Sequence, residues 1–196
     1  MKTKLDESHK CLLEGWDTFL KMRTCESEIE RFLQDAAKSA IQELRKRYGG
    51  QKEFVVVEKP LTTDKDNPWF NIFRASLEDS RGEQPKLVFG IEGISVNGLL
   101  LPSSNCPCRA YAVWEQEVDP DPAGLFHKWR QAFRMSLPSG FVEFKGADYE
   151  QWFCLKPLAP IEPGQLIDAQ FLVGHFVNPL ATLFDWYSEN KRSLLA

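Results

Sequence analysis

The sequence predicts an α+β fold: a mostly antiparallel sheet of about five to seven strands, with an N-terminal helical pair, one central helix and a C-terminal helical pair packed on it. Three observations favour this class. Apolar stripes at helical spacing occur near both ends, short β-branched or alternating runs fill the middle, and turn signals between those runs favour antiparallel pairing. We expect a single domain spanning residues 1–196, with a helical segment at 1–50, a strand-rich middle at 51–160 and helices at 161–196.

Two helices are expected within the first fifty residues. Apolar residues recur every three or four positions in the first, which extends to about Leu20. The second is expected at about residues 26–47, where one long apolar stripe lies between an acidic start and a basic end. Ser27 and Glu30 have the spacing of a capping box, and Gly49 begins a glycine pair that is typical of a helix end.

The middle of the chain is expected to supply the strands and the central helix. Asn97-Gly98 predicts a hairpin turn, because both residues tolerate positive φ. Leu125, Trp129 and Phe133 share one face of a helix predicted at 122–135. The runs that predict strands are 53–58, 69–75, 87–94, 109–115, 141–144 and 151–155.

The C-terminal helices, expected at 164–176 and 180–189 with a break at Asn178-Pro179, are almost free of charge. A helix that is apolar on nearly all sides is buried either in its own core or against a partner. Core burial is the simpler interpretation. The functional interpretation is an interface with a protein partner or with a second copy of the chain, formed by Phe176, Phe184 and Trp186.

Charge excludes one class of function and offers a second candidate surface. The chain has 24 Lys and Arg against 28 Asp and Glu, and a net charge of −4 argues against a nucleic-acid-coating protein. Glu115, Glu117, Asp119 and Asp121 alternate, so on an extended segment they share one side and can attract a basic partner. The simpler interpretation of this acidic segment is a solvated strand end.

The expected compartment is the cytoplasm. The first residues are charged and lack the apolar stretch of a secretory signal, and no apolar run approaches the length of a membrane span. Five cysteines in 196 residues are too few and too scattered for a disulfide framework. We therefore expect a protein with no disulfides and no membrane association.

No catalytic motif passes its spacing test. Cys106-Pro107-Cys108 has one residue between the sulfurs and no second pair, whereas zinc sites use two to four residues and four ligands. The chain has no nucleophile elbow and no phosphate-binding glycine loop. We therefore expect no resident metal or cofactor, and the sequence favours a protein that is not an enzyme.

One catalytic alternative comes from the order of the elements. Helix, three strands and helix resemble the core order of PD-(D/E)xK nucleases, which hold a divalent metal with two carboxylates and use a lysine nearby. In that order Asp66 and Glu92 take the acidic positions, but no lysine stands two residues after Glu92. The residue types of the motif occur elsewhere, at Asp121, Glu143 and Lys145, with a predicted helix between Asp121 and the Glu143–Lys145 part. Mg²⁺ would be a cofactor only under this alternative.

The sequence thus predicts a cytosolic protein that acts by binding another macromolecule, most simply a protein, through the acidic segment or the apolar C-terminal helices. A homo-oligomer uses the same surfaces, and nucleic acid is not the expected partner. Two alternatives stay open. One is the metal-dependent nuclease, intact or degenerate, and the other is a small-ligand-binding domain with a pocket between sheet and C-terminal helices.

Overall fold

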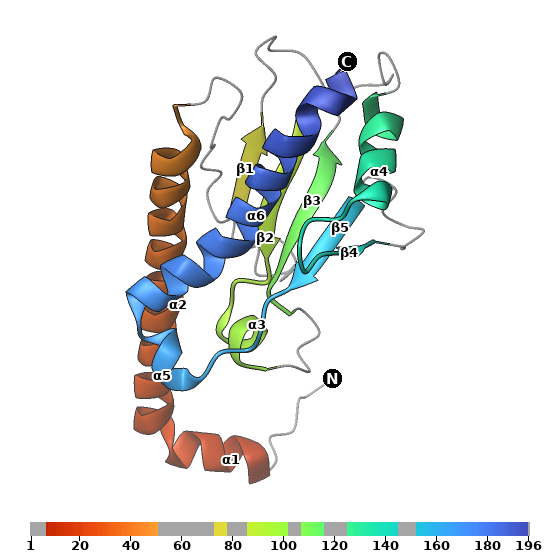
Figure 1. The fold of residues 1–196 in the computed structure, drawn as a ribbon. Coiled ribbons are helices and arrows are strands. Elements are labelled where there is room, and N and C mark those ends of the chain that lie inside the picture. The colour runs from red at the N-terminus through yellow and green to blue at the C-terminus, as the bar shows by residue number, and fades with distance from the viewer. Residues whose placement is uncertain are drawn as a thin grey trace.

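The computed structural model describes residues 7–50, 73–77, 86–101, 107–115, 125–144 and 152–195. Helices and strands are mixed along the chain, which confirms the α+β class (Figure 1). The elements are α1 (Glu7–Glu14), α2 (Trp16–Tyr48), β1 (Phe73–Leu77), β2 (Lys86–Glu92), α3 (Val96–Leu100), β3 (Arg109–Glu115), α4 (Leu125–Met135), β4 (Val142–Glu143), β5 (Trp152–Pro157), α5 (Pro163–Leu166) and α6 (Ala169–Leu195).

The sheet is antiparallel throughout, in the order β1-β2-β3-β5-β4. Four of its strands have five or more residues, and β4 is a two-residue edge paired to β5. The expected count of five to seven full strands is therefore not confirmed within the described residues. The pairing expected between 141–144 and 151–155 is confirmed, whereas 53–58 and the start of 69–75 lie outside those residues.

The predicted hairpin at Asn97-Gly98 is wrong. These residues lie in α3, a single helical turn that begins at Ser95. The Ser95 hydroxyl accepts a hydrogen bond from the Gly98 N–H at 3.0 Å, and the Ser95 carbonyl accepts from the Leu99 N–H at 3.0 Å. A serine cap thus satisfies the first amides of a helix and outweighs the turn preference of Asn-Gly.

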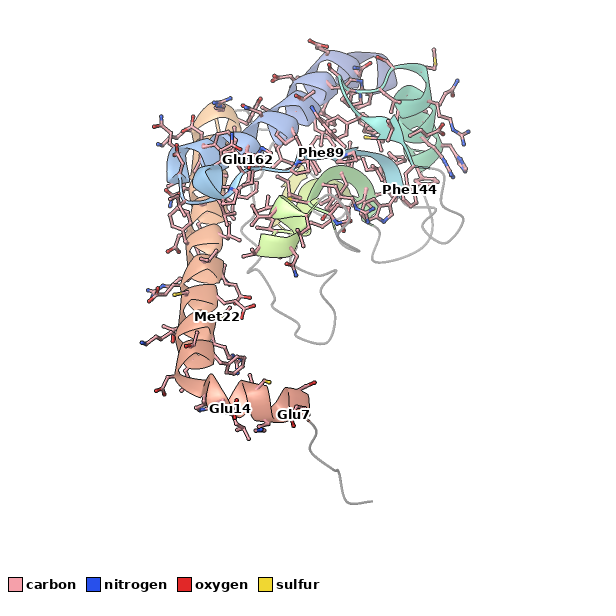
Figure 2. The ribbon with its side chains drawn as sticks, turned by 90° about the horizontal axis from the view of Figure 1, so that it is seen from below. Glu7, Glu14, Met22, Phe89, Phe144 and Glu162 are labelled. Carbon is pink, nitrogen blue, oxygen red and sulfur yellow. The ribbon has the colours of Figure 1, made fainter. Side chains whose placement is uncertain are left out.

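The helix expected at 26–47 begins earlier, at Trp16. The break between the two N-terminal helices falls at Gly15, where the chain turns sharply (Figure 2). Ser27 consequently lies inside α2, and the predicted capping box is wrong, because the residues before Ser27 also have helical apolar spacing. The expected end is confirmed: α2 stops before Gly49.

The expected break at Asn178-Pro179 is also wrong, since α6 continues through Pro179. The chain breaks earlier, at Asp168, whose carboxylate accepts a hydrogen bond from the Phe171 N–H at 3.0 Å. A proline inside a helix costs about 3 kcal/mol, so burial of the turns around it must offset that cost. The buried side chains on those turns are Phe176, Val177, Leu180, Leu183 and Phe184.

The core lies between one face of the sheet and a layer of helices. α6 crosses that face, beside α2 and next to α4 (Figure 1). From the sheet, Phe89 meets Phe184 with ring centroids 5.5 Å apart. From α4, Phe133 stacks on Trp186 at 4.1 Å. Aromatic contacts therefore join the sheet, α6 and α4 in one core.

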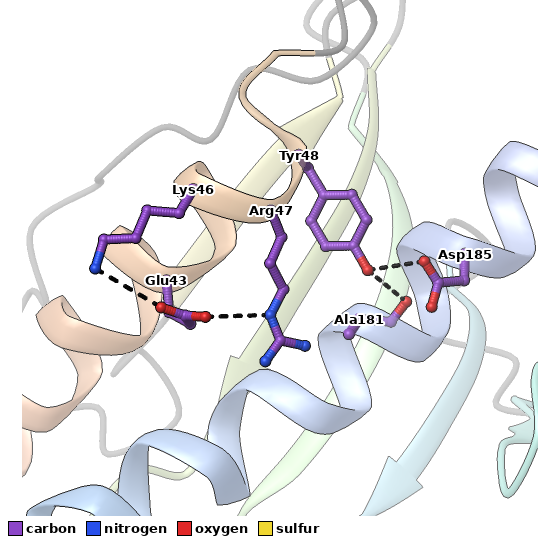
Figure 3. Close-up of polar contacts among 6 residues, drawn as sticks. All are labelled: Glu43, Lys46, Arg47, Tyr48, Ala181 and Asp185. Atoms are coloured by element: carbon purple, nitrogen blue, oxygen red, sulfur yellow. Dashed lines mark hydrogen bonds and ion pairs between the residues drawn. The ribbon is translucent and has the colours of Figure 1, made fainter.

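Tyr48 ties the end of α2 to α6 (Figure 3). Its hydroxyl donates to Asp185 Oδ1 at 2.8 Å and lies 3.4 Å from the carbonyl oxygen of Ala181. Its ring stacks on Phe184 at 4.7 Å. Burial raises the pKa of Tyr48, and the Asp185 carboxylate raises it further, so the hydroxyl keeps its proton and acts as donor.

We expect Tyr48→Phe to lower the free energy of unfolding by about 1–2 kcal/mol, because it removes a part-buried hydrogen bond to a charged acceptor. Asp185→Ala removes the same contact from the other side. In a double-mutant cycle followed by urea unfolding, the two losses should be non-additive. Strictly additive losses would show that the pair contributes no coupling energy.

Candidate binding surface

The acidic segment predicted to attract a partner lies largely outside the described residues. Glu117, Asp119 and Asp121 belong to residues 116–124, which the structure does not describe. Glu115 is the last residue of β3. The segment therefore leaves one described strand end, and its role as a binding surface stays a prediction.

The aromatic residues predicted as an interface on the C-terminal helix lie in the core of the chain. Phe184 is 0% exposed, and Phe176 and Trp186 are also buried. The Trp186 indole N–H donates to the carbonyl oxygen of Ser136 at 2.6 Å. These three side chains are thus covered by the protein itself, and an accessible surface must be sought elsewhere.

Glu92, one of the two acids in the nuclease alternative, is a buried ion-pair partner. It is 5% exposed, and Arg109 Nε donates to its Oε1. The Arg109 guanidinium also lies 5.4 Å from the centroid of the Trp152 ring. Burial raises the pKa of Glu92, and Arg109 opposes this rise. The carboxylate is therefore engaged by a cation of its own chain.

The other residues of the nuclease alternative are not brought together. Glu143 on β4 accepts from Arg134 Nε at 2.9 Å. Asp66, Asp121 and Lys145 lie outside the described residues. Across the described part of the chain, no three His, Cys, Asp or Glu side chains are grouped as a metal site would need.

His175 has the one buried side-chain nitrogen or oxygen of the described residues that lacks a hydrogen-bond partner, its Nε2. Its ring stacks on Phe171 with centroids 5.8 Å apart, and burial lowers its pKa. A neutral imidazole among aromatic rings fits a structural role for this histidine.

Five of the ten exposed large apolar residues in the described part of the chain lie at the N-terminal end of the helical layer. We call α1 and residues 16–28 of α2 the arm; it extends beyond the sheet and α6 (Figures 1 and 2). Burial within α2 begins only at Leu33. Leu13 is 60% exposed and Met22 is 67% exposed. The other exposed apolar residues of the arm are Leu12, Trp16 and Leu20.

One aromatic side of the arm is organised by ring contacts. Trp16 and Phe19 lie 5.3 Å apart between centroids, and the Arg23 guanidinium lies 6.0 Å from the Phe19 ring. These side chains succeed one another at intervals of three and four residues, so they share one face of α2. A contiguous apolar face of this kind, left open to solvent, is typical of an interaction site.

Sequence reasoning did not identify this surface, although its signal was visible. The apolar spacing from Leu12 to Leu20 predicted helical structure, although the predicted single helix is divided at Gly15 between α1 and α2. Pattern alone does not tell whether the covering surface belongs to the same chain. The structure shows that, among the described elements, none but α1 itself covers the start of α2 (Figure 2).

Other properties of the described residues agree with the sequence predictions. Cys11 and Cys25 are exposed free thiols, and Cys108 and Cys154 are buried free thiols. No described helix combines the length and apolarity needed to cross a membrane. No protein-family model, curated protein or solved structure matches this chain.

The raised pKa of Glu92 predicts a pH-dependent contribution to stability. Because the folded chain holds this proton more tightly than the unfolded chain, the stabilisation is complete below the ordinary value of 4.5 and is lost as pH rises through the folded value. Compared with Glu92→Gln, the wild type should therefore lose free energy of unfolding across that window. Urea unfolding of both proteins, from below pH 4.5 to neutrality, measures the difference.

The prediction is contradicted if the difference in free energy of unfolding between wild type and Glu92→Gln changes with pH in the opposite direction. If the wild type gains stability over Glu92→Gln as pH rises, the Arg109 guanidinium outweighs burial and holds the pKa of Glu92 low. Circular dichroism of Glu92→Gln at each pH provides the control, because it verifies that the compared states are both folded.

Proposed function

We propose that this protein acts by binding another protein, and that the arm is the binding surface. The observation that carries the proposal is the apolar face of Trp16, Phe19 and Leu20, on the part of α2 that extends beyond the folded body. Binding would cover apolar area that now contacts water, which is the main favourable term in protein association.

The composition of the arm supports this proposal. Trp and Arg are enriched among the residues that dominate interface energies, and the arm places Trp16 and Arg23 on the two sides of Phe19. The nearest part of the chain that is rigidly packed, Leu33 to Leu44, anchors the arm through the continuous helix α2. The arm is therefore a helical extension rather than a loop, which lowers the entropy cost of docking.

The proposal also includes the acidic segment and the cytoplasmic location predicted from the sequence. The acidic segment 115–121 remains a candidate for contacts with a basic region of the same partner. A cytoplasmic location remains the proposed compartment, and the exposed free thiols Cys11 and Cys25 are consistent with reducing surroundings.

We expect Trp16→Ser/Phe19→Ser to weaken partner binding by roughly 30-fold or more, since loss of aromatic anchors typically costs at least about 2 kcal/mol. Because this face is not part of the core, thermal unfolding should change little. The measurement is co-purification from the host followed by titration of the recovered partner against both proteins.

The matched control is Met135→Ser/Val142→Ser, which removes two exposed apolar side chains at the other end of the molecule. Met135 is 79% exposed, and Val142 lies on the edge strand β4. This variant should bind as the wild type does. The proposal fails if the protein is strictly monomeric and no stoichiometric partner is recovered, or if the arm variant retains the partner fully.

The nuclease alternative keeps one favourable observation. The long helix α2 precedes β1 and β2, which overlap the second and third strands of that order, and α4 follows. The first strand of that order, expected at 53–58, lies outside the described residues. The pairing of Glu92 with Arg109 weighs against it, because this carboxylate would have to leave a buried ion pair to hold a metal. Incubation with DNA and RNA in Mg²⁺ or Mn²⁺ tests it; cleavage by the wild type that Glu92→Gln abolishes would support it.

The small-ligand alternative has less support. The pocket expected between sheet and C-terminal helices is the region where Phe89, Phe184 and Tyr187 pack edge to face, with Phe89 and Tyr187 centroids 6.4 Å apart. Ring packing of this kind fills the space between the two layers. A thermal-shift screen that stabilises the protein with one ligand class would restore this alternative.

A further inference from the structure

We propose that the partner of the arm is the arm of a second copy, paired with it in antiparallel orientation around a two-fold axis between Arg23 and Glu26. This inference rests on the proposed function, because it names the occupant of the same surface. It is carried by one row of residues along α2, by the charges within that row, and by the point where α6 stops covering it.

The row follows the heptad spacing of a coiled coil without interruption. Steps of three and four residues alternate along α2 from Trp16 to Leu44, which is the a/d spacing of paired helices. Three members of this row, Arg23, Glu26 and Glu30, are charged where a coiled coil usually has apolar residues. The C-terminal members are buried within the chain: Leu33, Ala37, Ala40 and Leu44. The N-terminal members lie outside the core: Trp16, Phe19, Arg23, Glu26 and Glu30.

The two halves of the row differ because α6, the helix that covers α2, does not reach its N-terminal half. α6 begins at Ala169 and packs beside α2, whose buried residues begin at Leu33. Below that point α2 continues alone toward Gly15 (Figures 1 and 2). At 1.5 Å per residue, the uncovered part from Trp16 to Ile29 is about 20 Å long, enough for nearly four helical turns of a second helix.

The charged residues in the uncovered N-terminal half of the row indicate which partner fits it. Arg23 and Glu26 both belong to the row, and within the described chain neither forms an ion pair. In an antiparallel pair, an a position of one helix faces a d position of the other, so Arg23 of one copy faces Glu26 of the other. The symmetry operation creates this contact twice, which is the property of an isologous interface.

The same register places Trp16 of one copy opposite Leu33 of the other, and Phe19 opposite Glu30. The turn around Leu33 is flanked by Ile29 and Phe32, which are half-buried and extend the core toward the arm. The outermost layer of the interface is thus apolar, the next layer pairs Phe19 with Glu30, and the centre is an ion-pair layer that fixes orientation and register.

Charge exchange between the two positions tests the arrangement. Arg23→Glu and Glu26→Arg each place like charges in both central contacts, so each variant alone should be shifted toward monomer. An equimolar mixture of the two should form a heterodimer, and Arg23→Glu/Glu26→Arg should restore the homodimer. Sedimentation velocity over a dilution series measures all four cases beside the wild type.

Each outcome decides the inference. Weakened single variants with recovery in the mixture and in the double variant support it, since a merely structural effect would not be rescued by mixing. It is overturned if the wild type stays monomeric at every concentration, or if the single variants dimerise as the wild type does. Both positions are exposed, and circular dichroism confirms that each variant is folded.

The proposed function has a separate readout. If the wild type is monomeric yet Trp16→Ser/Phe19→Ser loses a different protein recovered from the host, the arm binds a foreign partner and only the inference of self-pairing fails. If the wild type is monomeric and no protein is recovered, both fail. Dimerisation with intact charge rescue supports both.

Discussion

The rest of the structure depends on the need to cover α6. This helix carries apolar side chains on nearly all sides, so it is stable in water only when several other elements pack around it. The sheet contributes Phe89, α4 contributes Phe133, and α2 contributes Tyr48, each in ring contact with Phe184 or Trp186. The burial of α6 thus holds the sheet, α4 and α2 together and keeps Pro179 inside an unbroken helix.

Covering α6 also determines what is left uncovered. α2 has 33 residues, whereas α6 meets only its C-terminal part, so the lengths of the two helices do not match. The half of α2 that packs on α6 is rich in alanine, which lets the helices approach closely, as at Ala36, Ala37 and Ala40. The other half carries Trp16 and Phe19, whose larger side chains suit a different neighbour.

Much of the fold could be predicted from local patterns, and the errors share one physical cause. β2, β3 and α4 followed from periodicity, because their burial requirements repeat within each element. The errors at Asn97-Gly98 and Pro179 arose where a local preference of about 1–3 kcal/mol met stronger capping or packing, and the error at Ser27 arose because helical spacing continues on its N-terminal side. Turn and break signals are local preferences that compete with tertiary contacts. Those contacts involve residues distant in the sequence, so the neighbouring residues do not reveal them.

The candidate binding surface also depends on tertiary contacts, but one feature of the sequence indicates where it lies. The heptad spacing runs the length of α2, but the spacing does not show that α6 begins only at Ala169 and leaves the N-terminal half uncovered. What distinguishes the open half in the sequence is the change of chemistry within the row, from Leu33, Ala37 and Ala40 to Arg23, Glu26 and Glu30. Charges at such positions would be costly against the chain's own apolar core, because they would be buried without counter-charges. They are tolerable at a surface that opens to water, and they become specific when a partner supplies the opposite charge. A row of helical spacing that turns from apolar to charged therefore indicates where a protein's own core ends.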